Sequence, residues 1–237
     1  MTETTLLEVS QLTSGYGKET VLQGVDLHVK QGELVAVIGR NGVGKSTLMR
    51  TLVGLMKTRS GKIQFGGTEV SDLPPDRRAR AGIGYIPQGR EVFPELTIRE
   101  NLLVGEVANV DGDAPDYERV YRFFPILKER SRQRAGTLSG GQQQQLAIAR
   151  AMIGNPALML LDEPSEGIQP SIIKDIARNL RSLNAETGAA VLLVEQNLDL
   201  IVSLADRGYV MEKGRIKATL GPKAIRDREQ VRKHLTI

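Results

Sequence analysis

The sequence of 237 residues contains no cysteine, no tryptophan and only two histidines. Without cysteine, disulfides, thiolate metal sites and cysteine nucleophiles are excluded. Because His28 and His234 lie far apart and outside any motif, we expect no histidine-based metal cluster. No apolar run approaches about 18 residues, so no segment is predicted to span a bilayer. The first ten residues lack a basic start followed by an apolar stretch, so we expect no signal peptide and a cytoplasmic protein.

The chain has a small excess of positive charge, +4, and few aromatic residues. Basic residues cluster at 77–80, 128–134 and 223–233, and each cluster contains or adjoins acidic residues. We interpret these clusters as solvated helix faces and predict no nucleic-acid partner. Contact with anionic lipid heads or with a partner protein is the alternative.

One stretch, residues 39–47, fits G-x-x-x-x-G-K-[ST], a loop that binds the phosphates of nucleoside triphosphates. A buried strand at 34–38 precedes it and a helix at 46–55 follows, which is the context that the motif requires. Glycines let backbone N–H groups converge on phosphate oxygens, and the helix N-terminus adds a positive dipole end. Lys45 supplies charge for the terminal phosphates, and the Ser46 hydroxyl is suited to ligate Mg²⁺. The loop consists of Gly39, Arg40, Asn41, Gly42, Val43, Gly44, Lys45, Ser46 and Thr47.

The alternation of strand and helix patterns predicts an α/β fold with a mostly parallel sheet and an antiparallel β subdomain. Strand patterns stop after residue 88, and helical spacing at 97–107 and 117–130, around a polar loop at 109–115, indicates a helical insert. We predict a single domain over 1–237, with a core of residues 1–88 and 138–237 and a helical part of residues 89–137. The strands are expected at 6–13, 21–29, 34–38, 62–65, 83–86, 158–163, 190–194, 209–211 and 215–220. A short basic helix is expected to begin at Pro74-Pro75, and the other helices are expected at 139–155 and 170–187, with a charged helix or tail over the last seventeen residues.

Polar side chains lie at the ends of three buried strands. The phosphate loop follows the strand at 34–38, Asp162-Glu163 ends the second strand, and Glu195-Gln196-Asn197 follows the third. Because ligands bind at the carboxyl edge of an open α/β sheet, Lys45, the two carboxylates and Gln196 are expected to meet there. Asp162 is suited to hold Mg²⁺ directly or through water, and Glu163 to polarise the attacking water. An isolated Asp-Glu pair after a strand would as readily cap a helix, but the phosphate loop in the same chain favours catalysis.

Taken in chain order, the phosphate loop, Gln88, an LSGGQ run and the strand that ends at Glu163 resemble the ATP-binding cassette of ABC transporters. The resemblance covers essentially the whole chain and implies a P-loop NTPase fold with a RecA-like core. Other P-loop classes do not carry LSGGQ at this position, and its hydroxyl and amides at a helix start form a second phosphate site. The resemblance implies that two cassettes dimerise head to tail, each ATP lying between one phosphate loop and the partner's LSGGQ loop. That signature loop is Leu138, Ser139, Gly140, Gly141 and Gln142.

The resemblance also implies roles for single residues, with ATP and Mg²⁺ as the cofactors. Tyr16 matches the aromatic residue that stacks on adenine, although packing within the β subdomain is an alternative. Gln88 matches the glutamine that reaches Mg²⁺ and hinges the helical insert, and Glu163 matches the catalytic carboxylate. The implied metal ligands are Ser46, Gln88 and Asp162.

Two positions depart from the family pattern. Gln196 stands where the family usually has a histidine, with neither histidine near it in the sequence, and Gln169 stands where many cassettes have aspartate. Glutamine can hydrogen-bond a γ-phosphate oxygen, so Gln196 remains a candidate catalytic residue, but it carries no charge and shuttles no proton. One alternative is therefore a nucleotide-gated clamp that hydrolyses little, against which the retained Glu163 argues. A cassette acting on nucleic acid is disfavoured, because the chain lacks a second cassette and a long coiled-coil insertion.

Four runs together resemble the second ATPase subunit of branched-chain amino-acid and amide uptake systems, and among these the chain is most similar to urea-type importers. The resemblance implies an ATP-hydrolysing subunit that energises uptake of urea, or of a related amide or branched-chain amino acid. The implied partners are a second ATPase subunit, identical or different, two transmembrane permease subunits and an extracytoplasmic solute-binding protein. The chain would then lie peripherally on the cytoplasmic side of the inner or plasma membrane. The runs are 39–45, 87–94, 163–170 and 195–197.

Overall fold

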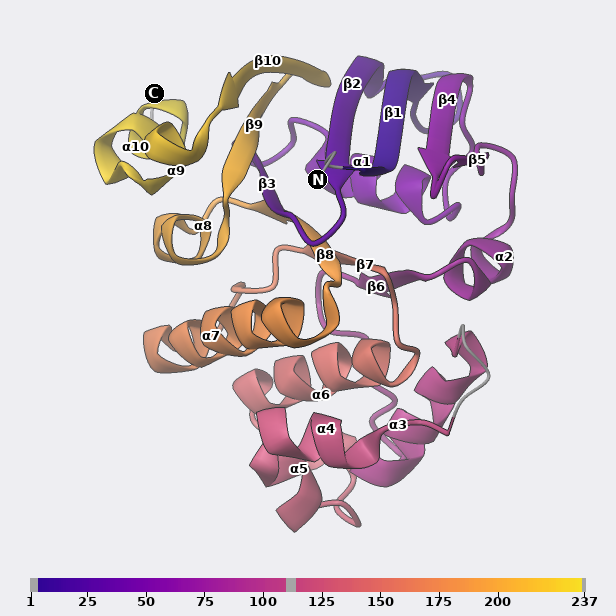
Figure 1. Ribbon diagram of the computed structural model, residues 1–237, viewed down its shortest axis with the longest axis vertical. Helices are drawn as coiled ribbons and strands as arrows, with labels where there is room; N and C mark the ends of the chain where they lie inside the picture. The colour runs from indigo at the N-terminus through magenta and orange to yellow at the C-terminus, as the bar shows by residue number, and fades with distance from the viewer. Residues whose placement is uncertain (1–3, 110–113, 236–237) are drawn as a thin grey trace.

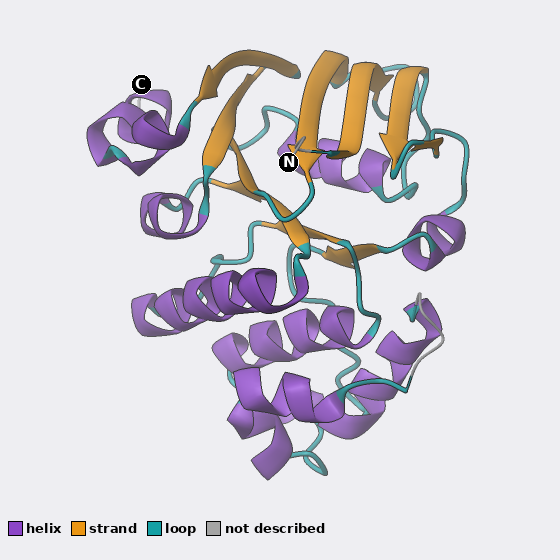
Figure 2. Cartoon of the chain, in the orientation of Figure 1, coloured by secondary structure: helices purple, strands orange, loops and turns teal. Residues whose placement is uncertain are grey.

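Two sheets and a group of helices form the molecule, for which a computed structural model describes residues 4–109 and 114–235. A four-stranded sheet lies at one end, a six-stranded sheet crosses the middle, and helices from the middle of the chain lie at the other end (Figure 1). Figure 2 shows the same separation by element type, with the strands gathered in the upper half of the view. The predicted α/β fold with an antiparallel β subdomain and a helical insert is thus confirmed.

The four-stranded sheet is antiparallel and is built from the first part of the chain. Inward and outward side chains alternate along its strands, as expected when one face is buried. Val9 pairs with Leu27 on one side and with Ile63 on the other, which places these apolar residues on the covered face. In spatial order the strands are β2 (Leu22–Lys30), β1 (Thr5–Ser14), β4 (Ser60–Phe65) and β5 (Thr68–Glu69).

The six-stranded sheet is parallel except at one edge, where β10 runs antiparallel to β9. In spatial order the strands are β10 (Arg215–Leu220), β9 (Arg207–Glu212), β3 (Leu34–Ile38), β8 (Ala190–Glu195), β7 (Leu158–Asp162) and β6 (Ile83–Ile86). Every residue of β3, β7 and β8 is buried, as the unbroken apolar runs predict. Ile38 pairs with Glu195 and Asp162 with Val194, so these three strands end at the same edge of the sheet.

Helices cover both faces of the six-stranded sheet. One face forms a core with α1 (Lys45–Leu52) and the four-stranded sheet, and the other with α6 (Gly140–Ile153), α7 (Pro170–Thr187) and α8 (Leu198–Leu204). Helix α7 is amphipathic as predicted, with Ile173, Ile176 and Leu180 among its buried residues. The remaining helices are α2 (Pro75–Arg80), α3 (Ile98–Gly105), α4 (Tyr117–Phe123), α5 (Pro125–Glu129), α9 (Pro222–Arg226) and α10 (Arg228–Leu235), with 3-10 turns η1 (Glu106–Ala108) and η2 (Ala135–Thr137).

Several helix predictions are wrong in extent. The helix predicted at 117–130 is broken into α4 and α5, because the residue before Pro125 is disfavoured in the helical conformation, and Phe124 leaves it with φ of −132° and ψ of 72°. The helix predicted to reach residue 55 ends at Leu52, and Gly54 follows in a left-handed conformation. The last seventeen residues contain two short helices, α9 and α10, rather than one. Helix α8 was not predicted, and residues 110–113 of the predicted loop at 109–115 lie outside the described residues.

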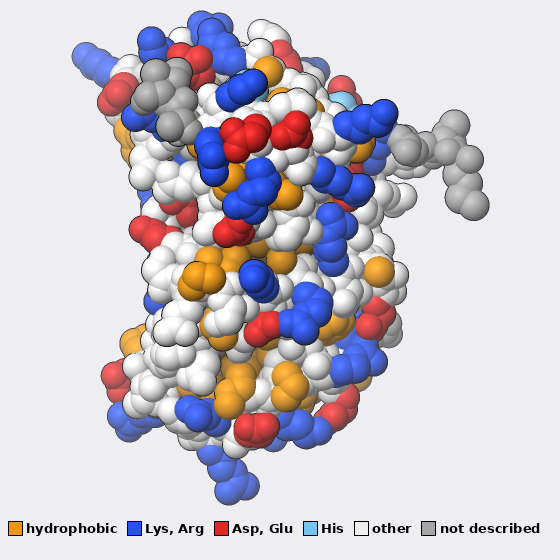
Figure 3. All heavy atoms as spheres, turned by 90° about the vertical axis from the view of Figure 1, so that its left-hand side faces the viewer, with side chains coloured by type: hydrophobic (Ala, Val, Ile, Leu, Met, Phe, Trp, Pro, Cys, Tyr) orange, Lys and Arg blue, Asp and Glu red, His pale blue; other side chains and the backbone are white. Residues whose placement is uncertain are grey.

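The helices and the surface charge bear on two further points. Within residues 4–109 and 114–235, no helix is both long and apolar enough to cross a membrane. Figure 3 shows the face with β10, α9 and α10, where acidic side chains lie among the basic ones. This mixture fits the interpretation of the basic clusters as solvated faces.

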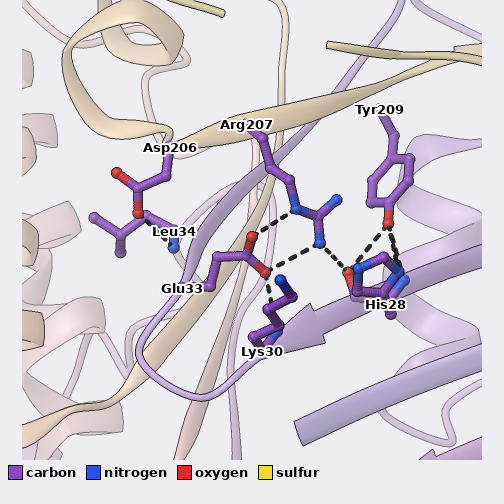
Figure 4. A network of polar contacts seen from close by, with 7 residues as sticks. All are labelled: His28, Lys30, Glu33, Leu34, Asp206, Arg207 and Tyr209. Carbon is purple, nitrogen blue, oxygen red and sulfur yellow. Dashed lines mark hydrogen bonds and ion pairs between the residues drawn. The ribbon is translucent and has the colours of Figure 1, made fainter. Parts of the chain in front are cut away.

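A partly buried polar network joins the two sheets (Figure 4). The Arg207 guanidinium on β9 bonds both carboxylate oxygens of Glu33, at 2.5 and 3.0 Å, and also donates to the His28 carbonyl on β2. The Tyr209 hydroxyl lies 3.2 Å from His28 Nδ1. Burial, and then the Arg207 charge, lower the pKa of His28. The network fixes β2 against β9 and hence the four-stranded sheet against the six-stranded one.

Candidate functional site

The phosphate loop leaves the end of β3 and enters α1 at Lys45. Gly42 and Gly44 adopt φ of 79° and 108°, a region that favours glycine. At Gly39 a Cβ would lie 2.5 Å from the Met211 carbonyl oxygen, so only glycine fits against β9. The glycines therefore set the path of the loop, which turns its backbone toward the start of α1 as a phosphate site requires.

The Lys45 ammonium is buried between the loop and the carboxylate that follows β7. Its Nζ donates to the carbonyl oxygens of Gly39 and Arg40, at 2.9 and 3.0 Å, and lies 2.9 Å from Glu163 Oε1. Glu163 has a left-handed backbone with φ of 46°, which is uncommon for a residue with a side chain. Two residues 118 positions apart are thus in direct contact, as the strand order predicts (163 − 45 = 118).

Asp162 faces Ser46 at the same edge. Its carboxylate is 2% exposed, and Oδ1 accepts a hydrogen bond of 3.0 Å from Ser46 Oγ. Burial raises the pKa of Asp162 to about 6, although the Ser46 hydrogen bond opposes the shift. A hydroxyl and a carboxylate oxygen side by side fit Mg²⁺, which takes a few protein oxygens and completes its shell with phosphate oxygens and water. Within the described residues, no three His, Cys, Asp or Glu side chains form a metal-binding group, so such an ion would need these outside ligands.

A cleft of about 430 Å³ brings the phosphate loop together with Tyr16, Gln88, Glu163 and Glu166. The Tyr16 ring is 48% exposed, and its hydroxyl accepts a hydrogen bond of 3.3 Å from Arg50. A ring this exposed is not a core residue of the β subdomain, which leaves its face open to a flat ligand. Gln88 Nε2 donates to Glu166 Oε2 at 3.0 Å, so in this structure the Gln88 amide engages a carboxylate rather than Ser46 or Asp162.

Gln196 lies at a different hollow from Lys45 and Glu163. This second hollow, of about 650 Å³, also involves Arg40, Asn41 and His234, and it meets the first cleft at Asn41. Of the four residues expected to meet, Lys45, Asp162 and Glu163 lie together. Gln196 lies in the neighbouring hollow, which adjoins the first cleft at Asn41 of the phosphate loop. Helix α10 brings His234 to the hollow of Gln196, a proximity that their 38-residue separation (234 − 196 = 38) concealed.

Glu195 is a buried carboxylate to which the sequence analysis gave no role. Its Oε1 accepts a hydrogen bond of 3.0 Å from the Ser165 N–H, and its Oε2 accepts from the N–H groups of Gln196 and Asn197 at 2.8 and 2.7 Å. Burial raises the pKa of Glu195, and these hydrogen bonds oppose the shift. The side chain links the loop after Glu163 to the turn after β8. A charged residue that closes a buried strand is the one sequence signal for such a role.

The signature loop lies at the start of α6. Ser139 is the N-cap: its Oγ accepts from the Gln142 N–H, and its own N–H donates to Gln142 Oε1 at 3.1 Å. Leu138 is buried, whereas Ser139 is exposed. None of the five signature residues is among those that line the cleft with Lys45.

Several known proteins are similar to this chain in sequence or in fold. The profile described as ABC transporter matches residues 22–166. The chain is 46% identical to the high-affinity branched-chain amino acid transport ATP-binding protein BraG of Pseudomonas aeruginosa, over 89% of this chain and 91% of that protein. It is 34% identical to a probable branched-chain amino acid transport ATP-binding protein, LivF, of Archaeoglobus fulgidus, over 89% and 90%. A dimeric, post-hydrolysis structure of an ATP-binding cassette bound to ADP and Pi is 26% identical and superposes with a TM-score of 0.78, over 91% and 98%.

Proposed function

The chain belongs to the ABC transporter family, and from this membership we propose that it is the ATP-hydrolysing subunit of an importer for branched-chain amino acids or a short amide such as urea. As a member of the family it is an ATPase cassette that binds ATP. The observation that carries the proposal is the contact of Lys45 with Glu163 beside the Ser46–Asp162 pair. This contact places Lys45, which would bind phosphate, and Glu163, the candidate base, at one edge of the sheet.

In the proposed reaction, the phosphate loop and Lys45 hold the β- and γ-phosphates, and the Tyr16 face stacks on adenine. Glu163 orients the attacking water and accepts its proton as the water adds to the γ-phosphorus and the bond to the β-phosphate oxygen breaks. Most of the catalytic effect then comes from positioning and charge, because phosphoryl transfer needs little covalent chemistry from the protein. The exposed Tyr16 ring and the shared cleft support these assignments.

Mg²⁺ is the metal that the donor set at this edge fits. Ser46 and Asp162 would hold it, with Gln88 as a third candidate once its amide leaves Glu166. When bound, the ion neutralises charge on the phosphate oxygens. Asp162 must be ionised to serve as a ligand, which its raised pKa makes sensitive to mildly acidic pH.

We assign the signature loop, residues 138–142, to the nucleotide of a second cassette. It lies apart from this chain's own cleft, yet it presents a Ser139 hydroxyl and the N-terminus of a 14-residue helix at the surface. Such a helix end attracts phosphate. The dimeric cassette structure described above supports a paired arrangement, with either an identical or a different second subunit.

An apolar hollow of about 270 Å³ supports a membrane partner. It lies between α2, β6, α3 and α6, and it includes Leu55 and Val104. Leu55 is 62% exposed and Val107, close by on η1, is 74% exposed. Exposed apolar groups gathered around a hollow are typical of a protein interface. We assign this surface to the permease subunits, which would hold the chain peripherally at the cytoplasmic side of the membrane and receive solute from a binding protein outside.

The solute is the least direct part of the proposal, because no described site contacts it. The names of BraG and LivF support branched-chain amino acids, and the motif resemblance supports urea or another short amide. Uptake of labelled leucine and labelled urea at low concentration, in a strain lacking this chain, separates the two.

We expect the wild-type chain to restore one of the two uptakes and Glu163→Gln to restore neither. Restored leucine uptake assigns branched-chain amino acids, and restored urea uptake assigns urea. If deletion changes neither uptake, both solute assignments are wrong.

A nucleotide-gated clamp is the second candidate function, and the position of Gln196 favours it. The Gln196 side chain lies at the hollow beyond the phosphate loop, away from Lys45 and Glu163. ATPase activity of the purified chain, alone and with its partner ATPase, decides between the two. Turnover abolished by Glu163→Gln supports catalysis here, whereas turnover only in the partner's site supports the clamp.

A further inference from the structure

Arg90 lies where three functional loops meet. It follows Gln88 in the segment after β6, and both Arg90 and Glu91 have left-handed backbones, with φ of 72° and 45°. Two consecutive residues with side chains rarely adopt this region, so surrounding contacts must hold the turn in place. The turn directs the Arg90 side chain toward the loop after Glu163 and toward the signature loop.

The contacts of the guanidinium are specific. Arg90 NH2 donates to the Glu166 carbonyl oxygen at 3.1 Å and lies 3.5 Å from the carbonyl oxygen of Gly167. Its other terminal nitrogen occupies the space above Gly140, where a Cβ would lie only 2.8 Å from it. Gly140 leaves room for the planar group, which therefore packs on the signature loop and is tied to the loop of Glu163 at the same time.

We propose that Arg90 is a positioning residue that couples the loop after Glu163 to the signature loop of the same chain. The inference rests on the proposed function, in which Glu163 serves this chain's own ATP and Ser139 serves the partner's. A change at one nucleotide is thereby passed through Arg90 to the loop that completes the other site.

The neighbouring contacts explain why a displacement would be transmitted. The Gln88 amide bonds the Glu166 side chain, and Arg90 bonds the Glu166 carbonyl, so the segment 88–90 is attached twice to the loop after Glu163. If ligand binding moves Glu166, the guanidinium moves with it and presses on or releases Gly140. Arg90 is not among the residues that line the cleft, so it acts through the loops and not on the nucleotide.

The test compares Arg90→Met and Arg90→Lys with the wild-type full-length chain. Hydrogen–deuterium exchange is measured with and without ATP, in EDTA so that no hydrolysis occurs. We expect ATP to slow exchange at residues 39–47 in every protein, and to alter exchange at residues 138–143 by about threefold or more in the wild type only. Arg90→Lys keeps one donor but not the planar fork, so we expect a partial response.

Arg134→Met is the matched control, because Arg134 is an exposed arginine in the same helical region whose side chain pairs with Glu95 at the surface. It should respond to ATP as the wild type does. An equal response of residues 138–143 in Arg90→Met and the wild type would overturn the proposal. A weaker response at residues 39–47 in Arg90→Met would overturn it too, since Arg90 would then support ATP binding itself. Exchange in EDTA does not depend on turnover, so failure of the proposed ATPase role would appear separately as absent phosphate release.

Turnover provides a second readout that a merely structural role would not move. With Mg²⁺, we expect Arg90→Met to lower kcat about tenfold and to bring the Hill coefficient for ATP to about 1, with ATP affinity within about twofold of the wild type. Unchanged kcat and Hill coefficient would contradict the coupling.

Discussion

Asp162 and Glu163 are adjacent in the chain, yet their carboxylates face different groups. Asp162 accepts from Ser46, whereas Glu163 contacts Lys45. The left-handed backbone at Glu163 turns its side chain away from the direction that the strand would give it. One conformational exception thus separates a metal ligand from a candidate base.

Replacing Glu163 with glutamine tests its role as the base. Glutamine keeps the shape of the side chain but accepts no proton, so we expect kcat for ATP to fall about 100-fold or more while ATP still binds. Phosphate release and binding of a fluorescent ATP analogue measure the two effects. Glu186→Gln is the control, because Glu186 is an exposed carboxylate that pairs with Arg122 and does not line the cleft, and its kcat should stay within about threefold. Equal turnover of Glu163→Gln and the wild type would contradict the assignment.

We expect ionisation of the Asp162 carboxyl group to lower the stability of the folded protein. Because the pKa of Asp162 is raised to about 6, the folded state keeps a proton between about pH 4 and 6 that the unfolded chain has lost. Stability attributable to this group therefore falls as pH rises through that window. At pH 7.5, without Mg²⁺ or nucleotide, we expect Asp162→Asn to raise the free energy of unfolding by about 1–3 kcal/mol and to abolish Mg²⁺-dependent hydrolysis.

Denaturant unfolding at pH 7.5 and pH 4 measures the effect, which should disappear at the lower pH. A less stable Asp162→Asn protein at pH 7.5 would show that the carboxylate is stabilised, rather than strained, by its surroundings.

At the scale of elements, the ion pair between Arg207 and Glu33 joins β9 to the turn before β3. Both side chains are less than one-fifth exposed. Arg207→Met leaves Glu33 buried without its partner, so we expect the free energy of unfolding to fall by about 2–4 kcal/mol. Arg215→Met is the control, since the Arg215 side chain is exposed and donates to Gln23, and the change should cost less than about 1 kcal/mol. Urea unfolding of the two variants checks this, and equal losses would contradict a special role for the network.

The elements best predicted from sequence are those whose pattern is local. Uninterrupted apolar runs identified β3, β7 and β8, and the glycine spacing at 39–47 identified the phosphate loop. The helix over 117–130 was predicted too long because periodicity continued through Pro125 while the backbone did not. Helix α8 is only seven residues long, too short for its period to stand out from the turn before it.

Contacts between distant segments account for what the sequence did not reveal at the site. The separation of Gln196 from Lys45 depends on the turn after β8, which Glu195 holds through three backbone N–H groups. His234 reaches the same hollow only because α10 packs against α8 and α9. No spacing rule encodes such proximities, since each depends on how several elements pack together.

At the scale of the whole molecule, the proposed function gives the chain two halves of a nucleotide site on different surfaces. None of the signature-loop residues 138–142 lines the cleft at Lys45. In a symmetric pair each surface of one copy would complete a site with the other surface of its partner. An inactive cleft and an inactive signature loop should therefore complement each other.

Mixing Lys45→Ala with Ser139→Glu tests this sharing in homodimers. Each variant alone should be inactive. In an equal mixture half of the dimers contain one copy of each variant, and one of their two sites is intact, so we expect about a quarter of wild-type ATPase activity. Dimers that form without regaining activity would contradict the shared site.

The pairing of Lys45 with Glu163 has one more consequence. A phosphate group and the Glu163 carboxylate compete for the same ammonium, so part of the binding energy of ATP is spent in displacing a resident anion. Before ATP binds, the Glu163 carboxylate is thus paired with Lys45. We expect it to leave Lys45 when a phosphate group takes its place. In the proposed function, ATP binding therefore releases Glu163 from Lys45, and the released carboxylate becomes available to orient the water that hydrolyses the nucleotide.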